Sequence, residues 1–195
     1  PRAWYSRLNQ FLLNLGFIKF PYEHAVYTKR EGVESLIVAV YVDDLLITGT
    51  SLSAIVKFKG EMSREFDMFD LGKLSYYLGL EVIQGAEYIE IRQSAYAKKV
   101  LDKAGMGECN TVNFPMEYKL QVHEDKTGEH LSPTHYKSIV GGLRYLVHTR
   151  PDIAYALGIV SRYIERPTEL HLNTVKRICR YVKGTLDYGL IYAKG

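Results

Sequence analysis

Two apolar runs with a short polar segment between them lie in the first quarter of the chain. The runs are residues 36–40 and 45–47, and Tyr41–Asp44 separates them. Runs of this length and composition predict β-strands, and a short break between two strands predicts a hairpin. We therefore expect an antiparallel hairpin with Asp43 and Asp44 at its tip. The first run does not alternate, which is typical of a strand covered on both faces.

Apolar residues recur at helical spacing on either side of this hairpin. They predict a helix over residues 2–15 and a second helix that begins at Ser51 or Ser53 and ends at Phe66. Residues 27–30 predict one more strand before the hairpin. Helices that cross between strands and pack on one face of an antiparallel sheet indicate an α+β fold.

A second hairpin is predicted further along, from strands over residues 77–83 and 88–91. Gly79 inside the first of these strands indicates either a bulge or a close approach of another backbone. Ser94 is the expected N-cap of a helix over residues 95–104.

The last third of the chain is predicted to be helical. Residues 108–133 show little periodicity and hold prolines and a glycine, which indicates a connector between two parts of the molecule. Three amphipathic stripes follow with short links, as in a small helical bundle, and residues 189–192 predict a closing strand. The predicted division is 1–107, 108–133 and 134–195. The stripes are Tyr136, Ile139, Val140, Leu143 and Val147; Ile153, Ala156, Leu157, Val160 and Ile164; and Leu172, Val175, Ile178, Cys179 and Val182.

Composition narrows the class of protein. With 47% hydrophobic residues, the chain can bury a core and is not of the disordered class. No apolar run approaches the roughly 18 residues of a membrane span, so we expect no membrane segment. The chain opens on Pro1 without an initiator Met, and we expect it to be a piece of a longer protein. A net charge of +3 gives only a weak overall attraction to nucleic acid.

The paired aspartates are the main chemical signal. Asp is depleted in strands, and a hairpin turn favours Gly rather than a second Asp after the first. Two ionised carboxylates side by side repel each other unless a cation lies between them. Mg²⁺ is a hard cation that one or two carboxylates and substrate phosphates can hold. The alternative is a plain turn, because Asp also tolerates turn dihedrals.

Five ordered motifs extend this signal, and together they resemble the copia-type branch of the retrotransposon Pol polyprotein. The Tyr-Val-Asp-Asp segment itself is similar to the active-site hairpin of reverse transcriptases. The motifs are Pro1-Arg2-Ala3-Trp4-Tyr5, Tyr41-Val42-Asp43-Asp44-Leu45-Leu46-Ile47-Thr48-Gly49, Phe69-Asp70-Leu71-Gly72, Tyr77-Leu78-Gly79-Leu80-Glu81 and Arg150-Pro151-Asp152-Ile153-Ala154-Tyr155-Ala156.

The resemblance implies a partial polymerase palm followed by a thumb-like helical bundle. It implies an RNA-directed DNA polymerase in which Asp43 and Asp44 are catalytic and hold Mg²⁺ or Mn²⁺. In the family a third carboxylate lies upstream of the first helix, so we expect this chain to be inactive by itself. The implied partners are an RNA or DNA template-primer, deoxynucleoside triphosphates, the N-terminal fingers and palm half, and the ribonuclease H domain. The implied location is a cytoplasmic virus-like particle.

Further residues are candidates for contact with nucleic acid. The resemblance places Tyr41 and Val42 beneath the primer end, and Leu78 and Gly79 in the primer-grip hairpin. A packed strand aromatic is the alternative for Tyr41. A basic ridge on the last helix is a candidate to follow the phosphate backbone, although a solvated helix face gives the same pattern. The ridge consists of Lys176, Arg180 and Lys183.

Two other functions remain open. One is a vestigial or reused retroelement fragment that binds nucleic acid without chemistry. The other is a palm nucleotidyl transferase that is not a polymerase and shares only the acidic hairpin.

Overall fold

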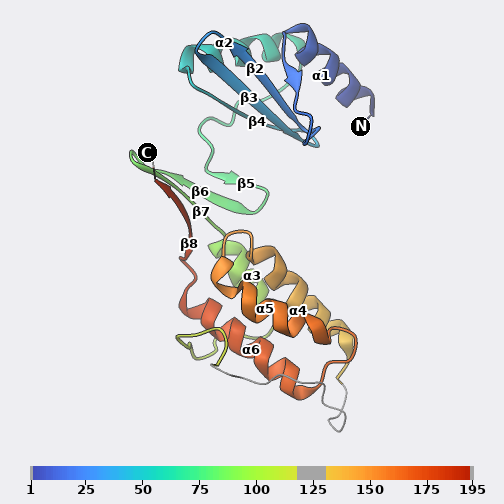
Figure 1. Ribbon diagram of the computed structural model, residues 1–195, viewed down its shortest axis with the longest axis vertical. Coiled ribbons are helices and arrows are strands. Elements are labelled where there is room, and N and C mark those ends of the chain that lie inside the picture. Colours follow the sequence, from blue (N-terminus) through green and yellow to red (C-terminus); the bar gives the residue numbers. More distant parts are fainter. Residues whose placement is uncertain (1, 118–130, 194–195) are drawn as a thin grey trace. The chain divides into compact units, whose positions relative to one another are not determined.

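The computed structural model describes residues 2–117 and 131–193. The chain forms two compact units, residues 1–72 and 73–195, each of which combines helices with an antiparallel sheet (Figure 1). The predicted α+β class is therefore confirmed. The predicted domain limits 1–107, 108–133 and 134–195 stay a prediction. The two compact units divide after Gly72.

The first unit is a four-stranded antiparallel sheet with two helices. The strands lie side by side in chain order, and hairpins join β2 to β3 and β3 to β4. Both predicted helices and all three predicted strands are present. The elements are α1 (Arg2–Asn14), β1 (Ile18–Lys19), β2 (Val26–Glu31), β3 (Glu34–Tyr41), β4 (Asp44–Gly49) and α2 (Leu52–Glu65).

Both helices of this unit pack on one face of the sheet (Figure 1). Leu36, Val38 and Val40 of β3 are buried in the core with the apolar residues of α1 and α2. Ile37, between them on the opposite face, is 41% exposed. Within this unit the prediction that β3 is covered on both faces is therefore wrong, because α1 and α2 supply only one layer.

The sequence left two serines open as the cap of α2, and the structure selects Ser51. Its backbone is extended, and its hydroxyl accepts a hydrogen bond from the Ala54 N–H at 3.4 Å. A side-chain acceptor at this position satisfies one of the N–H groups that a helix leaves unpaired at its start.

The second unit joins another four-stranded antiparallel sheet to a helical bundle. The chain's last strand, β8, pairs with β7 and closes the sheet order β5-β6-β7-β8. The three predicted bundle helices and the closing strand are all present. The elements are β5 (Tyr76–Tyr77), β6 (Leu80–Gln84), β7 (Tyr88–Arg92), α3 (Ser94–Lys103), α4 (Pro133–Leu146), the 3₁₀ turns η1 (Pro151–Ile153) and η2 (Ser161–Tyr163), α5 (Ala154–Val160), α6 (Glu169–Gly184) and β8 (Gly189–Ala193). Residues 118–130 of the predicted connector lie outside the described residues.

The predicted strand over residues 77–83 is wrong in one respect. The chain reverses at Leu78 and Gly79, so that β5 pairs back onto β6 through Tyr76–Glu81 and Tyr77–Leu80. Leu78 and Gly79 have φ values of 51° and 82°, both in the left-handed region. Positive φ at both central residues is the geometry of a type I′ hairpin turn, so neither a bulge nor a continuous strand is present.

The predicted cap of α3 also differs from the observed one. Ser94 is the first helical residue, and its hydroxyl is buried without a hydrogen-bond partner. The carboxylate of Glu81 on β6 instead accepts from the Ala95 N–H at 2.7 Å. A residue distant in sequence thus supplies the acceptor that a local cap would have supplied.

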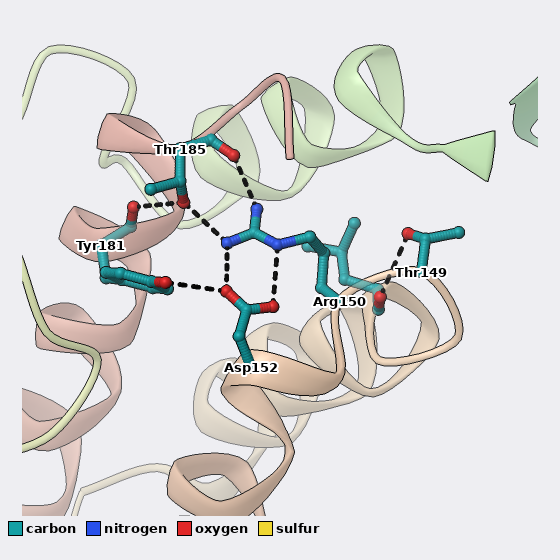
Figure 2. Close-up of polar contacts among 6 residues, drawn as sticks. Thr149, Arg150, Asp152, Tyr181 and Thr185 are labelled. Atoms are coloured by element: carbon teal, nitrogen blue, oxygen red, sulfur yellow. Dashed lines mark hydrogen bonds and ion pairs between the residues drawn. The ribbon is translucent and has the colours of Figure 1, made fainter. Parts of the chain in front are cut away.

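A buried arginine ties the start of α5 to the end of α6 (Figure 2). Arg150 is 3% exposed, and its guanidinium forms two parallel hydrogen bonds with Asp152, at 3.0 and 2.7 Å. It also donates to the carbonyl and hydroxyl oxygens of Thr185, at 2.7 and 2.6 Å. The Tyr181 hydroxyl donates to the same carboxylate at 2.8 Å. The Arg150–Ala156 motif therefore has a structural role in this unit.

Burial and hydrogen bonding act in opposite directions on the Asp152 carboxyl. Burial raises its pKa, but the hydrogen bonds from Arg150 and Tyr181 outweigh burial and hold the pKa below its usual value. The carboxylate is therefore the stable form beside the buried guanidinium at neutral pH.

Candidate active site on the acidic hairpin

The predicted hairpin is present, and its turn consists of two residues. Tyr41 pairs with Asp44 across the ladder, so Val42 and Asp43 form the turn itself. Val42 has a φ of 55°, and Asp43 is not among the residues of positive φ. A positive φ at only the first central residue is typical of a type II′ turn, which matches the twist of the flanking strands. Asp43 thus lies in the turn and Asp44 begins β4.

The register of the hairpin decides which side chains share a face. Paired residues point to the same side of an antiparallel sheet, and successive residues alternate. Val40 and Leu45 face the helices, whereas Tyr41 and Asp44 lie on the opposite face. Tyr41, Asp43 and Asp44 are all exposed. Within this unit Tyr41 is therefore not a packed strand aromatic, which was the alternative interpretation of this residue.

Val42 holds an unusual backbone conformation at the tip. A β-branched residue with positive φ is a steric outlier, which costs on the order of 1–3 kcal/mol. The side chain is 72% exposed, so core packing does not compensate for this cost. The ladder on both sides of the turn holds the conformation, since six residue pairs join β3 and β4. Backbone strain of this kind is typical of functional sites.

We expect Val42→Gly to raise the free energy of unfolding of the first unit by about 0.5–1 kcal/mol. Glycine adopts positive φ without steric strain. The relief of the backbone strain at this position exceeds the entropic disadvantage of glycine, which is about 0.5–1 kcal/mol. The measurement is urea unfolding of the 195-residue chain, followed by the single tryptophan, Trp4, which packs against the core of the first unit.

Val33→Gly is the matched control for this substitution. Val33 is 95% exposed in the turn between β2 and β3, and its φ is not positive. Its replacement relieves no strain, so we expect a loss of up to about 1 kcal/mol. Equal losses in the two variants would mean that the Val42 backbone is not strained.

The donor set at the tip fits a hard divalent cation in part. Asp43 and Asp44 offer adjacent exposed carboxylates, and Mg²⁺ is commonly bound through one or two carboxylates together with substrate phosphates. Among the described residues, no group of three or more His, Cys, Asp or Glu side chains is arranged to hold a metal ion. The pair therefore fits a site that substrate and a further ligand complete, and it does not form a closed protein cage.

The other candidate residues for nucleic-acid contact lie in the second unit. Leu78 and Gly79 form the β5–β6 turn, and the Tyr145 hydroxyl of α4 donates a hydrogen bond to the Leu78 carbonyl oxygen. Sequence reasoning missed Tyr145. The available signal was a tyrosine near the end of a predicted helix and outside its apolar stripe.

The predicted basic ridge on α6 is partly engaged by the chain itself. Lys176 is exposed, and Lys183 is half-buried. Arg180 donates through Nε to the Asn110 carbonyl oxygen at 2.7 Å, and Arg177 forms an ion pair with Glu117 at 2.8 Å. The described part of the predicted connector therefore lies along this helix. Binding of nucleic acid by Lys176, Arg180 and Lys183 stays a prediction.

Comparison with known proteins identifies relatives over the whole chain. The profile of the family described as reverse transcriptase (RNA-dependent DNA polymerase) matches residues 1–118. The chain is 34% identical to the retrovirus-related Pol polyprotein from transposon RE1 of Arabidopsis thaliana, a match that covers 100% of the chain and 13% of the polyprotein. It is 35% identical to the corresponding polyprotein from transposon TNT 1-94 of Nicotiana tabacum, over 95% of the chain and 15% of that protein.

A third relative is closer in length. The putative transposon Ty5-1 protein of Saccharomyces cerevisiae is 31% identical over 100% of the chain and 64% of its own length. No solved structure matches the chain. None of the described helices combines the length and the apolar character that crossing a membrane requires.

Proposed function

The chain belongs to the reverse transcriptase (RNA-dependent DNA polymerase) family, in its copia-type branch, and on that premise we propose that it supplies the acidic hairpin of such a polymerase. The reaction is extension of a DNA strand on an RNA or DNA template. The observation that carries the proposal is the register of the β3–β4 hairpin. It puts Asp44 and Tyr41 on the face of the sheet that the unit's helices leave uncovered, next to Asp43 in the turn.

Asp43 and Asp44 are the residues that we propose hold the divalent metal ions which reverse transcriptases use. When bound, such ions neutralise phosphate charge and align the attacking and leaving oxygens of a nucleotidyl transfer. The protein's part is to keep two carboxylates in fixed positions on a rigid ladder. A shift of about 1 Å in such a group can reduce the rate about a hundredfold. This sensitivity gives a reason for a strained turn that the β3–β4 ladder holds in place.

Further parts of the polymerase complete this site in the proposal. A third carboxylate and the segment that contacts the incoming nucleotide come from the palm and fingers region that precedes the matched span in the Pol polyproteins. The primer end meets the β5–β6 turn, and the duplex follows the exposed part of α6. The ribonuclease H domain follows the matched span. The proposed setting is a cytoplasmic virus-like particle.

Primer extension tests the proposal. We expect the 195-residue chain by itself to bind a primer-template duplex but to add no measurable nucleotides in Mg²⁺. Joined to the upstream segment of its own reading frame, it should extend the primer with deoxynucleoside triphosphates, and chelation of the metal should stop the reaction.

Two outcomes would contradict this view in different ways. Robust synthesis by the 195-residue chain alone would refute the need for an upstream carboxylate. Salt-sensitive duplex binding without synthesis in the joined protein would favour a nucleic-acid-binding module that lacks chemistry.

A further inference from the structure

A small cavity lies between α2 and the hairpin that joins β2 to β3. Its volume is about 190 Å³, and its lining residues all belong to the first unit. It adjoins the first residues of β3, whereas the acidic turn follows the last residue of that strand. At roughly 3.3 Å per residue, β3 separates the two places by about 20 Å. The cavity is therefore not part of the proposed metal site.

The inner wall of the cavity is apolar and partly aromatic. Phe17, Leu36 and Phe58 line it, and each of them is at most 8% exposed. The ring centroids of Phe17 and Phe58 are 5.0 Å apart, and the ring planes meet at 50°. Ala54 of α2 contributes only a methyl group to the lining. This wall therefore offers apolar surface against which the stem of a ligand can be buried favourably.

Charged side chains also line the cavity. The hairpin provides Lys29, Glu31 and Glu34, and α2 provides Lys57 and Glu61. The pKa of Glu31 is lowered, mainly by its hydrogen bond and ion pair with Lys29 at 2.7 Å and to a lesser extent by the charge of Lys57. Glu34 and Glu61 form no ion pair with any residue that the structure describes. The cavity therefore carries an excess of one carboxylate over its ammonium groups.

Lys29 shows how a wall of this kind accommodates a cation. Its stem runs past Gly16, since a Cβ added there would be 3.7 Å from the Lys29 Cε, and its Nζ lies 6.0 Å from the centroid of the Phe17 ring. The face of an aromatic ring attracts an ammonium group, and the Glu31 carboxylate pairs with the same group. An aromatic ring and a carboxylate thus act together on one alkylammonium side chain.

A second pair of this kind lies on α2. Phe58 and Glu61 are three positions apart, so they lie on the same side of the helix, and both line the cavity. Glu34, the first residue of β3, adds another carboxylate. A cation with an apolar stem can satisfy both the buried ring and the two carboxylates, because such groups bury the stem and keep the charged head near water.

We propose that this cavity binds a primary ammonium group on a short apolar stem, which is the chemistry of a lysine side chain or of a small free alkylamine. The stem lies against Leu36 and Phe58, and Glu34 and Glu61 hold the ammonium group. The volume is below the roughly 300–1,000 Å³ of pockets that hold drug-sized ligands, so the cavity suits one side chain or a small amine rather than a nucleotide.

NMR spectra of the 195-residue chain test the proposal with three probes that share a four-carbon stem. The probes are n-butylammonium, 1-butanol and pentanoate, which are cationic, neutral and anionic. We expect n-butylammonium to shift the methyl signals of Leu36 and Ala54 and the ring signals of Phe58 saturably, with a Kd on the order of 1–10 mM. 1-Butanol should bind about fivefold more weakly, and pentanoate should not bind. The methyl signals of Leu190, in the second unit, should stay unchanged.

Substitutions then assign the two carboxylates. Glu34→Gln and Glu61→Gln should each weaken n-butylammonium binding about two- to fivefold, which corresponds to the loss of one exposed ion pair. Glu87→Gln, at an exposed position of the second unit, is the matched control and should keep the full affinity. Ala54→Leu should fill the cavity and abolish binding of every probe. Urea unfolding followed by Trp4 verifies that each variant is folded.

Two further probes distinguish the sources of the ammonium group. One is a lysine between two glycines in a peptide with blocked ends, and the other is the free diamine 1,4-diaminobutane. Tighter binding of the peptide assigns the cavity to a lysine side chain of a protein, and tighter binding of the diamine assigns it to a free amine.

Three results would overturn the proposal. The absence of saturable shifts at n-butylammonium concentrations well above the expected Kd would show that the cavity takes no such ligand. Equal affinity for 1-butanol, or full affinity in the chain that carries both Gln substitutions, would refute the role of the carboxylates. Tighter binding of pentanoate would mean that Lys29 and Lys57 determine the charge preference. None of these measurements requires DNA synthesis, so a failure here leaves the proposed function unaffected.

Discussion

Asp43→Asn and Asp44→Asn are each expected to lower DNA synthesis by the complete polymerase roughly a thousandfold. Asparagine has nearly the same shape as aspartate but no charge, so it is a poor ligand for a hard cation. Removal of one electrostatic stabiliser of a transition state reduces rates by about 10²–10³, and a lost metal ligand belongs at the upper end. The measurement is the single-turnover rate of primer extension over a titration of Mg²⁺.

The stability of the fold and a second exposed carboxylate supply the controls for this prediction. Both aspartates are exposed, so the Asn variants should unfold at the same urea concentration as the unsubstituted chain, or at a slightly higher one. Asp67→Asn, an exposed carboxylate beyond α2 in the same unit, should retain the full rate. Undiminished synthesis by Asp43→Asn would mean that Asp43 is only a turn residue and does not act in catalysis.

Arg150→Met should lower the free energy of unfolding of the second unit by about 3 kcal/mol. The substitution leaves the Asp152 carboxylate with the Tyr181 hydroxyl in place of three donor groups and removes the guanidinium from the Thr185 oxygens, and breaking a buried pair costs about 3–5 kcal/mol. We expect the lower end of this range because the Asp152 side chain is about one-third exposed, so that water can donate hydrogen bonds to its carboxylate in place of the guanidinium. Arg150→Lys should recover little, since an ammonium group cannot form the two parallel bonds. Urea unfolding followed by far-ultraviolet circular dichroism measures the change.

The pH dependence of stability checks that the ion pair is the cause. The pKa of Asp152 is lowered in the folded chain. Its carboxylate therefore contributes fully to the free energy of unfolding above the ordinary carboxyl pKa of about 3.9, and this contribution is lost as the pH falls below that value. The stability difference between the unsubstituted chain and Asp152→Asn should therefore be constant from about pH 7 to 5 and shrink below about pH 4. Arg162→Met is the matched control for Arg150→Met. Arg162 lies at an exposed position of η2, so its substitution should leave the free energy of unfolding nearly unchanged. A difference that does not change with pH would assign the effect to packing.

Local patterns were sufficient for the elements near the acidic hairpin. The strands β3 and β4 follow from two apolar runs, and the exclusion of paired Asp from strand interiors puts Asp43 and Asp44 at the turn. The helices α1, α2, α4 and α6 follow from apolar residues at helical spacing, whose stripes need only one buried face. Position along the chain decides such features, and for that reason they can be predicted without a structure.

Contacts between distant segments accounted for the misreadings. Nothing near Ser94 in the sequence announces that Glu81 takes the capping role on α3. The run Tyr77–Ile83 has strand-like composition, but the chain reverses at Leu78 and Gly79, where the Tyr145 hydroxyl of α4 binds the Leu78 carbonyl oxygen. Arg180 looked like part of a free basic ridge because its acceptor, the Asn110 carbonyl, lies 70 positions away.

The amino-acid sequence by itself determined that the chain carries a β-hairpin with Asp43 and Asp44 at its tip, because hydrophobic period, turn chemistry and charge repulsion all act between neighbouring residues. Its likeness to the active-site hairpin of reverse transcriptases rests on the resemblance of its motifs to that family. Only the tertiary structure decided that Tyr41 and Asp44 share the face of the sheet opposite α1 and α2, that Arg150 is buried against Asp152 and Thr185, and that the Tyr145 hydroxyl binds the Leu78 carbonyl oxygen. Those relations depend on strand register and on packing between remote segments, which a one-dimensional pattern does not encode.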